Sequence, residues 1–169
     1  MAARHRQMPL KTITGARLGF VLSDGGRKEA GFSQKRFHDC VIRAMATATN
    51  TKYADVFDEV VRKDACFAAD IRGVLDDIWE PMLVKRGFAR SHFSYDDTTT
   101  FQFADAKFLP RGRYFVCTER QGKDKVLHHA FAVIDGKIYD NGDSRKLPKP
   151  KKRGGILREI WVPKTQDEK

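Results

Sequence analysis

The chain has 169 residues, of which 41% are apolar and 32% are charged. This length fits a single domain and leaves no room for a second catalytic module. The composition supplies apolar residues for a core and charges for solubility, which excludes a wholly disordered chain. The apolar stretches are far shorter than the roughly 20 residues that a membrane-spanning helix needs. We therefore expect a soluble protein without a membrane partner.

The net charge of +10 is concentrated at the two ends of the sequence. Residues 1–36 carry +6, residues 37–143 carry −2 and residues 144–169 carry +6. Charge confined to the ends is typical of basic arms on an ordinary domain. We therefore expect a basic N-terminal arm with one short strand over 1–36, a folded domain over 37–144, and a basic loop with a final strand and tail over 145–169.

Cysteine usage indicates a reducing compartment. Cys40, Cys66 and Cys117 are odd in number and widely spaced, with neither a C-x-x-C pair nor a zinc-binding pattern around them. The first 20 residues contain no apolar run of secretory length, so we interpret them as retained. These features predict a cytoplasmic protein with no disulfide scaffold, metal ion or cofactor.

The first half of the chain predicts a strand and a turn, followed by helices. A short strand from Arg17 to Leu22 is followed by a turn at Ser23-Asp24-Gly25-Gly26. Apolar residues at helical spacing then predict a helix from Cys40 to Thr49. Asp39 stands directly before this helix and is a favourable N-cap residue.

Two further helices follow from the same spacing. One runs from Tyr53 through Val61 with acidic residues on its solvent side. The other runs from Ile71 through Leu83, with Asp70 as its cap, a kink near Pro81 and an end at Gly87.

The second half of the chain changes to an alternating pattern that predicts strands. The expected strands are Gly112 to Glu119, His129 to Ile134, Lys137 to Asn141 and Arg158 to Val162. Asp135-Gly136 separates two of them and is a strong signal for a two-residue hairpin, because Gly accepts the positive φ of a type I′ turn. Helices followed by strands predict an α+β domain with an antiparallel sheet.

Cys40 is the first candidate for chemistry. It stands in the first turn of its predicted helix, where the helix dipole and the unpaired N–H groups favour a thiolate. The competing interpretation is a small core residue on an apolar helix face, which is also our interpretation of Cys66 and Cys117.

The hairpin supplies the second part of the candidate site. If the loop is Asp135-Gly136, Phe131 opposes Asp140, and His129 and Asp140 become diagonal neighbours on one face of the sheet. His128 then faces the other way. A carboxylate that orients an imidazole beside a thiol is the arrangement that activates a cysteine nucleophile.

Three segments resemble papain-like cysteine peptidases of the C39-like type often encoded by bacteriophages. They are DCVIRAMATAT at 39–49, GRYFV at 112–116 and HAFAVIDGKIYD at 129–140, and the resemblance spans roughly residues 34 to 144. It implies a papain-like fold in which helices carrying Cys40 pack on a sheet carrying His129 and Asp140. It also implies a Cys40 nucleophile, a His129 base and an Asp140 orienting residue.

The resemblance further implies an oxyanion-hole residue and leaves one role open. Gln34 precedes Cys40 by six residues, as the oxyanion glutamine does in papain-like enzymes. The family often continues after the aspartate with Thr-Trp-Asp, whereas this chain has Asn141-Gly142-Asp143. Asn141 is therefore an alternative orienting residue.

The C-terminal basic segment has two interpretations. Six cations and two prolines between 145 and 153 predict an extended, solvated segment. It either binds a polyanion through salt-dependent phosphate contacts or serves only as a charged loop. The cations are Arg145, Lys146, Lys149, Lys151, Lys152 and Arg153.

Three functions fit these features. The first is a thiol-dependent peptidase or amidase that acts on a protein or peptide through an acyl-enzyme. The second is a catalytically silent binding module whose basic arms dock on nucleic acid, a nucleoprotein or a virion. The third is a transglutaminase or acyltransferase, which uses the same residues. A phage origin would place the protein in the host cytoplasm or in the virion.

Overall fold

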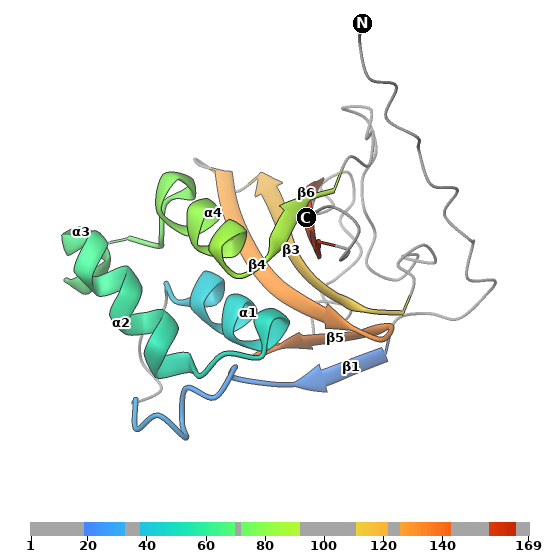
Figure 1. Ribbon diagram of the computed structural model, residues 1–169, viewed down its shortest axis with the longest axis horizontal. Helices are drawn as coiled ribbons and strands as arrows, with labels where there is room; N and C mark the ends of the chain where they lie inside the picture. Colours follow the sequence, from blue (N-terminus) through green and yellow to red (C-terminus); the bar gives the residue numbers. More distant parts are fainter. Residues whose placement is uncertain are drawn as a thin grey trace, which may run out of the picture.

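A computed structural model describes residues 19–32, 38–69, 72–91, 111–121, 126–142 and 156–164 (Figure 1). In chain order the elements are β1 (Gly19–Leu22), α1 (Cys40–Thr49), α2 (Tyr53–Lys63), α3 (Ala65–Ala68), α4 (Asp76–Lys85), β2 (Phe88–Arg90), β3 (Arg113–Gln121), β4 (Val126–Ile134), β5 (Lys137–Asp140) and β6 (Ile156–Pro163).

These elements form an α+β fold around one mixed sheet. Within the described residues the sheet has six strands in the order β1-β5-β4-β3-β6-β2. β1 runs parallel to β5, with Gly19 opposite Lys137, whereas the other neighbours are antiparallel. The expected purely antiparallel sheet is therefore wrong at β1. A parallel partner needs a long crossover, which the chain between β1 and β5 provides.

The predicted hairpin between β4 and β5 is confirmed. Ile134 opposes Lys137 and Ala132 opposes Tyr139. Asp135 and Gly136 have φ angles of 48° and 76°, as both central residues of a type I′ turn require. The loop is therefore two residues long, and the register follows from it.

The helices cover one face of the sheet (Figure 1). Buried residues of α1, α2 and α4 form one core with sheet residues that include Phe115, Ala130, Ala132 and Trp161. A second cluster on the alternate sheet positions includes Val116, Phe131, Val133 and Ile138. α1 packs directly against β4, which brings the start of this helix to the strand that carries His129.

The first helix begins at Cys40 and ends at Thr49, as predicted, and the second is two residues longer than predicted. The predicted start of the third helix at Ile71 is wrong. α4 begins at Asp76, and the backbone of Leu75, the residue before it, is extended. Acidic residues in a first turn complement the helix dipole, and Asp76 also accepts a hydrogen bond from Trp79 Nε1 at 3.0 Å. The expected cap Asp70 lies outside the described residues.

The short helix α3 was not predicted from the sequence. Its four residues are too few for helical spacing to be recognised. Asp64 caps it by accepting a hydrogen bond from the backbone N–H of Phe67, and Arg72 binds the same carboxylate at 2.9 Å. Pro81 lies inside α4, which continues to Lys85.

The strand β1 and the turn after it belong to the fold. β1 closes one edge of the sheet, and Gly25 in the following turn has a φ of 66°. A Cβ at Gly25 would stand 2.7 Å from the Cα atom of Arg43. The turn therefore lies directly against α1, although these residues were expected in a basic arm.

Candidate active site

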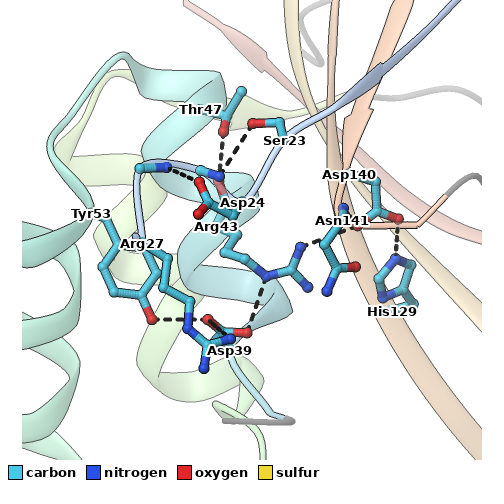
Figure 2. Close-up of polar contacts among 12 residues, drawn as sticks. Ser23, Asp24, Arg27, Asp39, Arg43, Thr47, Tyr53, His129, Asp140 and Asn141 are labelled. Carbon is cyan, nitrogen blue, oxygen red and sulfur yellow. Dashed lines mark hydrogen bonds and ion pairs between the residues drawn. The ribbon is translucent and has the colours of Figure 1, made fainter. Parts of the chain in front are cut away.

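The hairpin brings His129 of β4 and Asp140 of β5 into contact. His129 Nε2 lies 2.6 Å from Asp140 Oδ2 (Figure 2). The register between β4 and β5 ends at the Ala132–Tyr139 pair, so both side chains stand at the end of the paired region. The diagonal neighbours expected from the two-residue turn are thus hydrogen-bonded.

Asp140 is almost completely buried, and both of its carboxylate oxygens have donors. Oδ1 accepts from Arg43 Nη1 at 3.2 Å and from the backbone N–H of Asn141 at 2.8 Å, which leaves Oδ2 to His129. These three contacts fix the orientation of the carboxylate.

Cys40 is half-buried at the first residue of α1, and its sulfur meets two groups of β4. The ring of His129 and the backbone N–H of Ala130 both form hydrogen bonds with it. Since Nε2 of His129 is bound to Asp140, Nδ1 is the ring nitrogen left for the thiol. Three elements, α1, β4 and β5, therefore converge on one imidazole.

The surroundings of Cys40 favour its thiolate. Burial opposes ionisation, but the hydrogen bond and the charge of His129, the N–H of Ala130 and the charge of Arg43 outweigh it and lower the pKa of Cys40. The position of Cys40 at the start of a ten-residue helix acts in the same direction.

The surroundings of His129 favour its imidazolium. Burial would lower the pKa of His129, but the hydrogen bonds to Asp140 and Cys40 and the negative charges of both raise it to about 9. The lowered pKa of Cys40 and the raised pKa of His129 together favour a thiolate–imidazolium pair, with Asp140 as the second partner of the ring.

This pair predicts that iodoacetamide alkylates Cys40 before Cys66 and Cys117 near pH 7. Its thiolate reacts where an ordinary thiol, with a pKa near 8.5, is mostly protonated, so we expect Cys40 to react at least about tenfold faster. Its rate should rise with pH and level off below the ordinary thiol range. Peptide mapping by mass spectrometry at several pH values measures this. Because Cys66 is exposed and Cys117 is buried, faster labelling of either in the folded protein would contradict the prediction.

The other predicted site residues are distributed as follows. Asn141 is exposed, and it contacts Asp140 through its backbone N–H. His128 is exposed, next to the half-buried His129. Gln34 and the basic segment from Arg145 to Arg153 lie outside the described residues, so the oxyanion and polyanion roles stay predictions.

Sequence analysis missed a buried polar network that contacts the candidate site through Asp140. Asp39, read as an N-cap, makes no side-chain cap hydrogen bond. It binds Arg43, Tyr53 and Arg27 instead, at 3.0, 2.9 and 3.3 Å. The available signal was Arg43 itself, which is a charged residue within the apolar stretch of α1.

Comparison of the chain with protein-family models, curated proteins and solved structures found no match. The part of the chain that the structure describes has no helix long and apolar enough to cross a membrane. Over the same residues, no group of three or more His, Cys, Asp or Glu side chains is arranged to hold a metal ion.

Proposed function

We propose that the protein is a thiol-dependent peptidase or amidase with a papain-like arrangement of Cys40, His129 and Asp140. The observation that carries the proposal is the continuous contact from the Cys40 sulfur through the His129 ring to the Asp140 carboxylate. A nucleophile, a base and a group that orients the base are the three parts that covalent acyl transfer requires.

The acylation half-reaction follows from this charge state. The Cys40 thiolate attacks the carbonyl carbon and forms the S–C bond, while the negative charge moves to the carbonyl oxygen. The backbone N–H of Cys40, at the helix start, is a suitable donor to that oxygen. As the C–N bond breaks, the His129 imidazolium gives its Nδ1 proton to the leaving amine. The products are a thioester at Cys40 and a neutral imidazole.

Deacylation returns the site to its starting state. The neutral His129 takes a proton from a water molecule, which attacks the thioester carbon. The S–C bond then breaks and the thiolate leaves beside the new imidazolium. Asp140 takes no proton in either half-reaction and holds the ring through its contact with Nε2.

A peptide library tests the proposal. The intact protein is incubated with a mixture of peptides, and the products are identified by mass spectrometry, with Cys40→Ala as the control. We expect cleaved peptides and a thioester adduct on Cys40, both absent from the control. Amide products with an added amine would favour acyl transfer. A reactive Cys40 that forms no adduct and no product with any peptide would favour the binding module instead.

A further inference from the structure

Arg43 is the buried cation closest in sequence to the proposed nucleophile. It lies three residues after Cys40 on α1, about one helical turn away, and only 7% of its side chain is exposed. Asp39 Oδ1 accepts from its Nε at 3.0 Å, and Asp140 Oδ1 accepts from its Nη1 at 3.2 Å. One planar guanidinium therefore joins the residue before the nucleophile to the residue that orients the base.

The contact with Asp140 determines which carboxylate oxygen His129 meets. Arg43 and the backbone N–H of Asn141 both bind Oδ1, and His129 binds Oδ2. Rotation of the carboxylate would break both contacts at Oδ1. Arg43 thus holds the carboxylate in the orientation that the imidazole uses.

Arg43 is in turn held from its other side. Asp39 Oδ2 accepts from the Tyr53 hydroxyl at 2.9 Å and lies 3.3 Å from Arg27 Nη1. Tyr53, Asp39, Arg43, Asp140 and His129 form one connected row (Figure 2). The row starts on α2, crosses α1 and ends on the sheet, so it links the elements that carry the triad.

With Arg27 beside Asp39 and Cys40 beside His129, the charged groups along this row alternate in sign and balance. The cations are Arg27, Arg43 and the His129 imidazolium, and the anions are Asp39, Asp140 and the Cys40 thiolate. An uncompensated buried charge is costly, whereas a paired one in good geometry is tolerated. Asp39 and Asp140 raise the pKa of Arg43 against the effect of burial, so the guanidinium stays protonated. Arg43 also lies close enough to Cys40 for its charge to favour the thiolate.

We propose that Arg43, held by Asp39, is a positioning residue of the site: its fork orients Asp140 toward His129, and its charge stands about one helical turn from Cys40. This inference rests on the proposed function only for its effect on turnover, since the states of Cys40 and His129 are measured without any substrate. The competing interpretation is a buried ion pair that stabilises the fold and leaves both groups unchanged.

The test separates the charge of Arg43 from its geometry. Arg43→Gln removes the charge, and Arg43→Lys keeps the charge but loses the planar fork that binds two carboxylates. Arg86→Gln is the matched control. Arg86 also binds a carboxylate, that of Glu59 at 2.8 Å, but it lies at the end of α4, outside the row. Thermal unfolding verifies that each variant is folded.

The pH profile of Cys40 alkylation reports on the charge. In Arg43→Gln the rising limb should move to higher pH, by about one unit, so that the rate below the limb falls about tenfold. Arg43→Lys should keep the limb within a few tenths of a unit, and Arg86→Gln should not move it. A folded Arg43→Gln protein with the limb of the unmodified protein would overturn the role of the charge.

The titration of His129 reports on the geometry. In Arg43→Lys the NMR signal of the His129 ring should titrate below about 9, because a carboxylate held at Oδ1 by the Asn141 N–H alone is less well oriented toward the imidazolium. Once a substrate is known, kcat should fall about 10 to 100-fold with little change in KM. An unchanged His129 titration in Arg43→Lys would overturn the positioning role.

If Arg43→Gln does not fold, Asp39→Asn gives the second route to the same decision. It leaves Arg43 in place but weakens the contact between Arg43 and Asp39. It should therefore lower the pKa of His129, as Arg43→Lys does. Tyr53→Phe removes one donor to Asp39 and should cause a smaller shift in the same direction. Normal titration of His129 in a folded Asp39→Asn protein would contradict the proposal. Failure of the peptide library would not affect these readouts.

Discussion

Replacing His129 with alanine is expected to remove turnover almost completely, by about 10³-fold or more. The imidazole keeps the thiolate ionised, protonates the leaving amine and activates water, so a single substitution removes all three contributions. The rising limb of Cys40 alkylation should also move to higher pH, because the hydrogen bond and charge of His129 lower the pKa of that thiol. Peptide cleavage and the alkylation profile measure the two effects on the same preparation.

His128→Ala is the matched control for this experiment. His128 precedes His129 on β4, and successive side chains of a strand point to opposite faces. His128 is exposed, so its removal should leave both readouts within about twofold of the unmodified protein, as is usual for surface substitutions. The opposite ranking, with His128→Ala inactive and His129→Ala active, would refute the assignment of the base.

Replacing Asp140 with asparagine is expected to reduce turnover by about 10² to 10⁴-fold. The amide keeps the size of the side chain but loses the charge that holds the His129 ring. Without the charge of Asp140 to oppose the effect of burial, the pKa of His129 should fall below about 9. The alkaline limb of the rate profile should therefore move to lower pH. The profile of kcat/KM against pH measures both changes.

The loss of stability in Asp140→Asn should depend on pH. The pKa of His129 is higher in the folded protein than the ordinary value of 6.5, so its protonation stabilises the fold fully below pH 6.5 and this contribution disappears as the pH rises through about 9. Asp140→Asn should therefore lower the free energy of unfolding more at pH 6 than at pH 10. Urea unfolding at the two pH values measures the difference.

Asn141→Ala distinguishes the two orienting residues that the sequence left open. The side chain of Asn141 is exposed, and its contact with Asp140 comes from the backbone, which alanine retains. We expect turnover within about threefold of the unmodified protein. A larger loss in Asn141→Ala than in Asp140→Asn would mean that Asn141 orients the base during turnover.

Local sequence chemistry determined the parts of the site that lie close together in the chain. Asp135-Gly136 specifies a two-residue turn, because glycine adopts a positive φ easily, and the turn alone sets the register of β4 and β5. The alternation of strand side chains then predicts the contact between His129 and Asp140. The spacing of apolar residues also placed Cys40 at the start of α1.

Only the tertiary structure decided which distant residues meet. Arg43 and Asp140 are 97 positions apart, and nothing in the local pattern of either pairs them. Asp39 looked like an N-cap because its place before a helix suits one, but buried Arg27, Arg43 and Tyr53 compete for its carboxylate. A buried charge must find partners wherever packing brings them, so its contacts depend on the whole fold.

The same reason applies to the edge of the sheet and to the start of α4. The sequence predicted a strand from Arg17 to Leu22 without a partner, and the parallel pairing of β1 with β5 depends on which edge the assembled sheet leaves open. Apolar spacing extended the third helix back to Ile71, whereas α4 begins at Asp76. Buried Val74 is part of the core without being helical, because periodicity records which side chains are buried and packing decides the backbone that buries them.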